Sequence, residues 1–248
     1  LKADERERIA AVYEEIKGFF DVSVTLFMRK RYTNLPGEKT KSANLCSYIN
    51  LIGREYTVEK DAEGRERIKV KGNREKGLPV YIAIFDVDVL AVPDYLKHKV
   101  SFLHHPSHSR YGLIQSPYLV PSREGNVVAD ASGVHADWFY PWSLGLNHYK
   151  SSFWLGYNGV FRYETVKEED FFKADTAVED IEISLKVREK GYGILCTPDE
   201  ECVTYSPRSL EALKVQRERW ASGALRIMLL FVKNLFRKSY GSISMKEV

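Results

Sequence analysis

The chain has 248 residues, of which 44% are hydrophobic and 29% charged, so its composition excludes a mainly disordered protein and leaves room for one large domain. Three cysteines are too few for a disulfide scaffold and indicate reduced thiols in a cytosolic compartment. The net charge of +3 indicates no nucleic-acid partner. We expect neither a signal peptide nor a membrane-spanning helix, because no apolar run approaches the roughly 20 residues that a bilayer requires.

The first third of the chain is predicted to alternate helices and strands, which is typical of α/β proteins. A helix is expected at residues 4–18, a strand of alternating pattern at residues 22–28 and a short helix at residues 41–52. Residues 54–77 contain eight basic and six acidic residues. They predict a solvated surface insertion, a hairpin that turns at residues 61–64.

The continuous apolar run at residues 80–85 predicts a strand that is buried on both faces of a parallel sheet. The elements expected after it are a helix from Pro93, a strand at 112–115, an irregular aromatic-rich stretch to about residue 163, a helix at 176–190, a strand at 193–196 and long helices at 209–237. No repeat or linker interrupts the pattern, so residues 1–248 are predicted to form a single domain.

Two carboxylates, Asp86 and Asp88, follow the strand predicted at residues 80–85. In open α/β sheets ligands bind beyond the carboxyl ends of the strands. A pair of carboxylates there suits a hard divalent cation such as Mg²⁺ or Mn²⁺, which completes its coordination with phosphate and water. The alternative is that both residues only cap a turn.

Two further groups of polar residues begin or lie on predicted helices. Acidic residues at positions 179, 180 and 182 are explained by the helix dipole alone, unless a ligand site adds to it. Gln216, Arg219 and Trp220 have helical spacing and share one face. That face suits a phosphate and the flat side of a ring, although a packed tryptophan beside a surface arginine is equally consistent.

In this order the three groups resemble the processive-type inverting glycosyltransferases of family 2, the group of cellulose synthase, hyaluronan synthase and related glucan synthases. The hallmark is D-x-D, a glutamate–aspartate pair and Q-x-x-R-W. Two further blocks agree with it: Lys41 to Asn44 resembles K-x-x-N, and residues 153–162 (FWLGYNGVFR) resemble the loop on the acceptor side. The resemblance covers about residues 20–225. The triplet here is Val-Glu-Asp rather than Thr-Glu-Asp.

The resemblance implies a role for each matching residue. Asp180 would be the catalytic base, with Glu179 beside it. Asp86 and Asp88 would hold Mg²⁺ or Mn²⁺. The residues expected to bind the nucleotide-sugar are Lys41, Asn44, Asp86, Gln216 and Arg219, and those expected to bind the acceptor are Trp220, Phe153, Trp154, Gly156 and Asn158.

The resemblance also implies a glycosyltransferase-A type, Rossmann-like fold, with a mixed, mainly parallel sheet flanked by helices. The donor and acceptor core would span about residues 20–207, and the Q-x-x-R-W and interfacial helices about residues 208–238. The family's fold begins with two strands that have no counterpart here, and the second of them carries a base-contacting aspartate. The resemblance therefore describes an N-terminally truncated domain and leaves open whether this segment alone binds nucleotide or is active.

The C-terminal helix is predicted to be amphipathic and basic: residues 208–248 carry nine Lys or Arg and three Glu. The resemblance places such a helix on the cytosolic face of a membrane, in the soluble domain of a membrane protein. An ordinary core helix is the alternative.

The predicted function is inverting transfer of a hexose from a nucleotide-sugar, with UDP-glucose or a related UDP-sugar the expected donor, to a glycan, giving a β-linked polysaccharide. The alternatives are single transfer to a glycolipid, a non-catalytic carbohydrate-binding or regulatory module, and a glycoside hydrolase. A hydrolase would need no D-x-D at a strand end.

Overall fold

The computed structural model describes residues 8–9, 12–13, 24–72, 77–120, 125–176, 178–198 and 202–236. The helix expected at residues 4–18 lies outside these residues except for two short pieces, and so does the start of the strand expected at residues 22–28.

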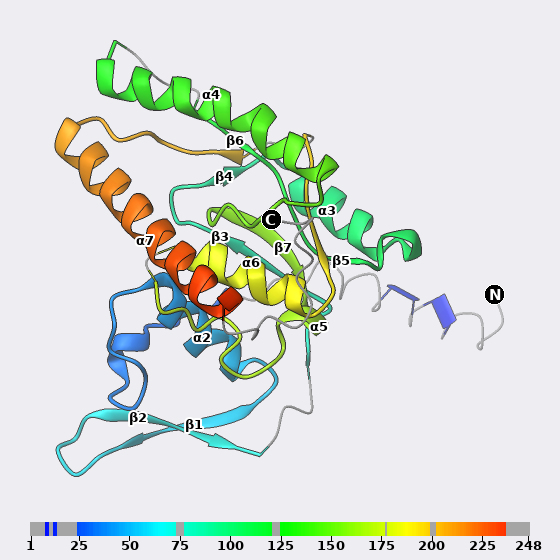
Figure 1. Cartoon of the computed structure of the whole chain (residues 1–248). Coiled ribbons are helices and arrows are strands. Elements are labelled where there is room, and N and C mark those ends of the chain that lie inside the picture. The colour runs from blue at the N-terminus through cyan, green and yellow to red at the C-terminus, as the bar shows by residue number, and fades with distance from the viewer. Residues whose placement is uncertain are drawn as a thin grey trace.

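The centre of the fold is a mixed sheet of four strands in the order β3-β7-β5-β8 (Figure 1). Its members are β3 (Tyr81–Phe85), β7 (Asn158–Arg162), β5 (Tyr111–Gln115) and β8 (Gly193–Cys196). β7 is antiparallel to both of its neighbours, and β5 is parallel to β8, so three of the four strands run in one direction. The predicted mixed, mainly parallel sheet is confirmed, but the neighbour of β3 among the described residues is antiparallel rather than parallel.

Two smaller sheets accompany the central one. β4 (Leu90–Ala91), β9 (Cys202–Val203) and β6 (Tyr118–Leu119) pair in the order β4-β9-β6. β1 (Glu55–Lys60) and β2 (Glu66–Lys71) form the expected hairpin, which projects from the lower end of the molecule in Figure 1.

Helices cover the sheet, and α6 lies across it in Figure 1 while α4 and α7 lie further out. The described helices are α2 (Lys41–Leu51), α3 (Tyr95–His104), α4 (Val127–His148), α5 (Tyr163–Val166), α6 (Glu179–Glu189) and α7 (Leu210–Phe236), with short 3₁₀ helices η1 (Arg29–Arg31) and η2 (Pro106–His108). No helix within the described residues is long and apolar enough to span a bilayer.

Side-chain alternation along the strands builds a core on each face of the central sheet. Leu113 and Phe161 point into one cluster, with Trp154 and Ile183 of the covering loop and helix α6. The next residue on β5, Ile114, belongs to the other cluster with Tyr95 of α3. The two clusters bury both faces of the sheet at β5 and β7, but β3, the strand predicted to be buried on both faces, is an edge strand of the described sheet, on which Ile84 is buried and Ala83 is exposed.

Two predicted segments are wrong. The backbone at residues 24–28 pairs with no described strand, and Val24 is 93% exposed, because an alternating pattern makes a strand only where a neighbouring strand supplies hydrogen bonds. The stretch expected to be irregular up to residue 163 contains the 22-residue helix α4 and strand β7. Pro141 and two glycines lie inside α4 and lower its intrinsic helix propensity, which hides it from sequence analysis.

Candidate active site

A cavity of about 660 Å³ lies where the end of β3, the start of α2, the start of α6 and the inner face of α7 meet. Ten of the predicted site residues line it: Lys41, Asp86, Asp88, Phe153, Gly156, Glu179, Asp180, Gln216, Arg219 and Trp220. Residues that are up to 179 positions apart in the sequence thus share one space, which supports reading the separate motifs as parts of one site.

Asp86 and Asp88 leave β3 in a tight turn, in which Val89 N–H donates to Asp86 O at 3.1 Å. Lys41 lies in the first turn of α2, and its Nζ donates to Asp86 Oδ1 and to the carbonyl oxygen of Gly156. The exposed Asp88 carboxylate has no hydrogen bond or ion pair within the described residues. The turn therefore offers one carboxylate already paired with a cation and one that is available to a ligand.

Asp180 lies in the first turn of α6, with its carboxylate against the loop that contains Gly156. Burial, followed by the negative charge of Glu179, raises the pKa of Asp180 to about 6, although the Ile181 N–H and Lys41 oppose the rise. A carboxyl group with a pKa near 6 can accept a proton close to neutral pH, which suits a general base.

Gly156 makes room for this carboxylate. A Cβ atom at Gly156 would lie 2.7 Å from Asp180 Oδ2, and the residue has a φ of +85°, which side-chain-bearing residues rarely adopt. The loop is held by Gln115 at the end of β5, which accepts from Leu155 N–H at 2.8 Å and donates to Phe153 O at 2.5 Å. Gln115 is a positioning residue that no sequence motif indicated.

The inner face of α7 carries Gln216 and Trp220 towards the cavity. One turn further along, Gly223 packs on Val178: a Cβ at Gly223 would lie 2.7 Å from Val178 Cγ2. This close approach brings α7 against the start of α6, and therefore the Q-x-x-R-W helix against the predicted base.

Three predicted site residues do not line the cavity. Asn44 is exposed on α2. Trp154 is fully buried in the core, where its Nε1 donates to Asn158 O at 2.7 Å. The Asn158 side chain is also fully buried, and it accepts from Tyr95 Oη at 2.6 Å and from Ser116 N–H at 3.1 Å. Trp154 and Asn158 thus support the loop from behind, because a side chain without exposed surface cannot contact an acceptor.

Helix α4 forms one wall of the cavity, and this wall was not predicted because the helix itself was not predicted. Ser132, His135 and Phe139 face the cavity from α4, opposite Arg217 of α7. The Ser132 hydroxyl is buried and has no hydrogen-bond partner within the described residues. Burial, together with the charge of Arg217, lowers the pKa of His135, which favours the neutral imidazole. The only sequence signal that could have identified this wall is the helical spacing of these three residues, which places them on one face of a helix.

Within the described residues, no three His, Cys, Asp or Glu side chains are grouped to hold a metal ion. A cation bound here would take most of its ligands from phosphate and water rather than from protein side chains. Mg²⁺ commonly does so, since it binds through one or two carboxylates and completes its shell with phosphates and water.

Comparison with known proteins agrees with the cavity's motifs. A family model described as "Glycosyl transferase family group 2" matches residues 81–245. Glucomannan 4-beta-mannosyltransferase 1 of Oryza sativa subsp. japonica is 27% identical over 189 residues, which are 74% of this chain and 34% of that relative. The chain thus spans about a third of the length of the relative that it matches.

Proposed function

The chain belongs to glycosyl transferase family group 2, and we propose that its cavity transfers a hexose from a nucleotide-sugar to a glycan acceptor with inversion at the anomeric carbon. The observation that carries the proposal is that the partly buried Asp180 carboxyl and the Lys41 ammonium group, which is paired with Asp86 after β3, line one cavity. The first can act as a base towards an acceptor hydroxyl, and the second can bind a diphosphate.

The diphosphate of the donor would lie at the start of α2. Lys39, Thr40 and Lys41 line the cavity there, and the unpaired N–H groups of a helix start favour an anion. Arg219 would approach the same phosphates from α7. The ion pair between Lys41 and Asp86 keeps the ammonium group at this place before the donor binds.

Asp88, with Asp86 beside it, would hold Mg²⁺ or Mn²⁺ against the diphosphate. A bound divalent cation supplies neutralisation of the charge that develops on the departing nucleotide. The exposed carboxylate of Asp88 fits this task, because nothing in the described residues occupies its oxygens.

We expect Asp88→Asn to raise the Mn²⁺ or Mg²⁺ concentration required for half-maximal transfer, because one charged ligand is lost. EDTA is expected to abolish wild-type transfer, and added metal to restore it. The measurement is a metal titration of label incorporation. Asp94→Asn, at an exposed position before α3, is the control. An unchanged metal dependence in Asp88→Asn would contradict this assignment.

The acceptor would approach Asp180 from the opposite side, where Trp220 and Phe153 offer ring faces to a sugar. Deprotonation of the acceptor hydroxyl by Asp180 would let its oxygen attack the anomeric carbon as the bond to the diphosphate breaks. A single displacement inverts the configuration, so an α-linked donor gives a β-linked product.

The pH dependence follows from the role of Asp180. A general base works in its ionised form, so transfer is expected to rise as the pH increases through about 6 and to level off above it. Glu179→Gln removes a negative neighbour, which lowers the pKa of Asp180 and moves the acid limb to lower pH. The check is a pH–rate profile. Glu182→Gln, in the same helix turn but outside the cavity lining, should leave the limb in place.

The α4 wall would orient the acceptor through Ser132 and His135. We expect Ser132→Ala to raise the acceptor KM several-fold with little effect on donor affinity, because Ser132 lines the cavity and its unpaired hydroxyl can gain a partner by rotating towards a bound sugar. Steady-state kinetics with varied acceptor and varied donor separate the two effects. Ser143→Ala, also on α4 but bonded to Phe139 O at 2.7 Å, is the matched control. Equal effects of Ser132→Ala on both substrates would contradict the role.

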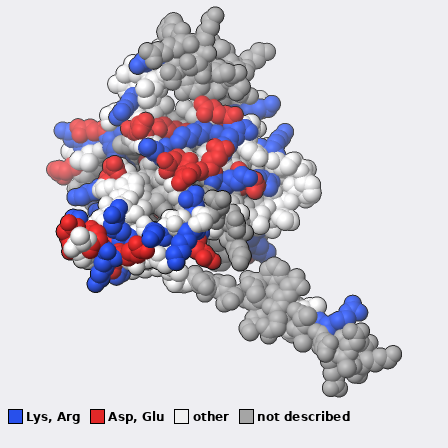
Figure 2. Space-filling view, turned by 90° about the horizontal axis from the view of Figure 1, so that it is seen from below, with Lys and Arg blue, Asp and Glu red and all other residues white. Residues whose placement is uncertain are grey.

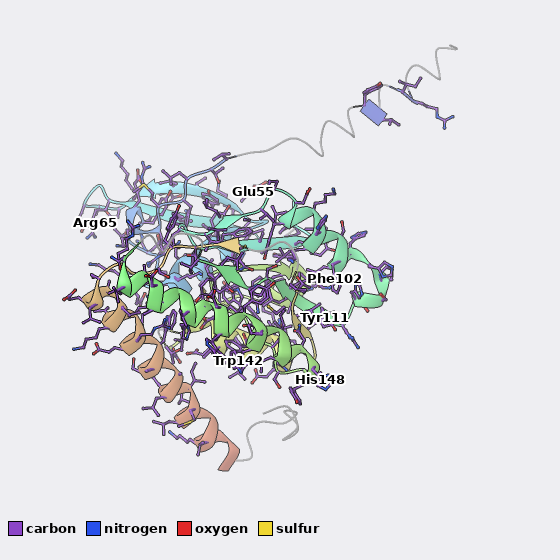
Figure 3. All side chains as sticks on the ribbon, turned by 90° about the horizontal axis from the view of Figure 1, so that it is seen from above. Glu55, Arg65, Phe102, Tyr111, Trp142 and His148 are labelled. Atoms are coloured by element: carbon purple, nitrogen blue, oxygen red, sulfur yellow. The ribbon has the colours of Figure 1, made fainter. Side chains whose placement is uncertain are left out.

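We propose that the outer faces of α4 and α7 rest on a membrane surface. Met228, Leu229 and Val232 are 53%, 59% and 41% exposed, and Trp142, labelled on α4 in Figure 3, is 49% exposed. Exposed apolar and indole side chains beside basic residues are typical of interfacial helices.

The function is tested with the gene that encodes this chain, expressed in membranes and incubated with labelled nucleotide-sugars and Mn²⁺ or Mg²⁺. Incorporation of one sugar into larger material identifies the donor, and incorporation into lipid extract indicates a glycolipid acceptor. Consumption of no donor by folded protein would overturn the proposal in favour of a binding module.

A further inference from the structure

The β1–β2 hairpin takes no part in the cavity, and its two long edges differ. The outer edge of β2 is covered. Thr33 N–H donates to Glu66 O at 2.9 Å, and the Asn34 side chain accepts from Ile68 N–H at 3.0 Å and donates to Ile68 O at 2.7 Å. Asn34 thus pairs with this edge as a neighbouring strand would.

The outer edge of β1 carries backbone groups that pair with no described residue. The register pairs Lys60 with Glu66, Val58 with Ile68 and Tyr56 with Val70. Since the groups of Glu66 and Ile68 point outward, the residues opposite them also point their N–H and C=O groups away from the hairpin. No described segment bonds to them, and β1 is exposed along its length except at Thr57.

We propose that two copies of this chain pair through β1, antiparallel about a two-fold axis at Val58, and so form a four-stranded sheet. In this register Val58 faces the partner's Val58, Tyr56 faces the partner's Lys60, and Thr57 faces the partner's Glu59. The outward backbone groups of Tyr56, Val58 and Lys60 then meet outward groups of the partner, so the open edge is bonded along its length.

The charge pattern of β1 selects this register. A shift of two residues in one direction places Glu55 opposite the partner's Glu59, and a shift in the other direction places Glu59 opposite the partner's Glu59. Like charges directly opposite each other destabilise a strand pair. A shift of one residue turns the partner's β1 over, so that the apolar side chains of the two copies lie on opposite faces of the joint sheet. Within β1 the proposed register avoids these conflicts, and the one acidic pair at its ends, Glu55 opposite the partner's Asp61, involves a carboxylate that is already paired with its own Arg65 at 3.0 Å.

The same register lengthens a row of apolar side chains across the paired hairpins and places a lysine beside an aromatic ring. Tyr56 and Val58 are 47% and 48% exposed, and pairing aligns Ile68 and Val58 with their counterparts in the partner. The partner's Lys60 lies beside the Tyr56 ring, where a cation is favoured. Figure 2 views the molecule from the hairpin side and shows basic and acidic side chains in mixed bands, so no field of one sign opposes pairing there.

Figure 3 labels Glu55 at the start of β1 and Arg65 near the hairpin tip, both towards the edge of the view. An edge contact of six residues buries little area, so the dimer is expected to be weak and dependent on concentration.

Cysteine cross-linking tests the proposed axis. Val58→Cys places two thiols opposite each other, and mild oxidation is expected to give a covalent dimer. Ala62→Cys, at the hairpin tip away from the axis, is expected to stay monomeric. The native cysteines are buried and give little background. Equal cross-linking of both variants, or none at Val58→Cys, would overturn the proposal.

Sedimentation equilibrium tests the edge without oxidation. The weight-average mass of the wild-type chain should rise towards twice the monomer mass with concentration. Val58→Pro, which removes an outward N–H and keeps the hairpin ladder, should remain monomeric, as should Lys60→Glu. Lys97→Glu, the same charge change on α3, should still dimerise. A wild-type chain that stays monomeric at every concentration, or a Lys60→Glu chain that dimerises normally, would contradict the pairing.

Discussion

Replacing Asp180 by asparagine is expected to lower sugar transfer by about 10²- to 10⁴-fold while leaving the fold intact. The amide keeps the shape of the carboxyl group but cannot accept the acceptor's proton. Donor binding should change little, because the proposed diphosphate contacts are Lys41 and Arg219 rather than Asp180. The measurement is initial-rate label transfer, together with nucleotide binding by calorimetry.

The same variant is expected to be at least as stable as the wild type at neutral pH. The folded-state pKa of Asp180, about 6, is above the ordinary value, so the stability that this group contributes falls as the pH rises towards 6. Asparagine removes that penalty. Glu189→Gln, an exposed carboxylate-to-amide change in the same helix, is the control and should alter neither property. Full activity in Asp180→Asn would remove the residue from the mechanism.

Replacing Gly156 by alanine is expected to reduce transfer about 100-fold, although alanine has no charge and is the smallest side chain that adds a Cβ. The new methyl would lie 2.7 Å from Asp180 Oδ2, so the carboxylate or the loop must move. The positive φ adds a folding penalty of about 1 kcal/mol. Rates at saturating substrate and thermal denaturation separate the two effects.

Gly145→Ala provides the matched control, because no atom lies within 4 Å of a Cβ built at Gly145 in helix α4. It should retain activity and fold normally. If Gly156→Ala kept wild-type rates, the close contact between the loop and Asp180 would not matter for catalysis.

The parts of the fold that sequence analysis predicted are those with strong local signals. The apolar run of β3, the charged hairpin with its turn at Gly64 and the helix α6 with Gly191 after it each carry their own pattern. Acidic motifs after β3 and at the start of α6 also identified part of the cavity lining, because the ends of neighbouring elements meet at one edge of a sheet.

The parts that were missed depend on tertiary contacts. Helix α4 has poor intrinsic propensity and is stabilised by packing, so Ser132 and His135 were missed with it. Gln115 looks like an ordinary strand residue until its amide is seen to hold the loop at Leu155. Trp154 carries a motif signal, but only the folded core shows that it has no exposed surface.

Asp180 is proposed to act as the base in a single displacement at the anomeric carbon. The most direct test is the anomeric configuration of the sugar newly joined to the acceptor, read by proton NMR after reaction with an α-linked nucleotide-sugar. A β-linkage is expected from the wild type, and Asp180→Asn is expected to form that product about 10²- to 10⁴-fold more slowly. An α-linked product, or a β-linked product formed equally by Asp180→Asn, would contradict this mechanism.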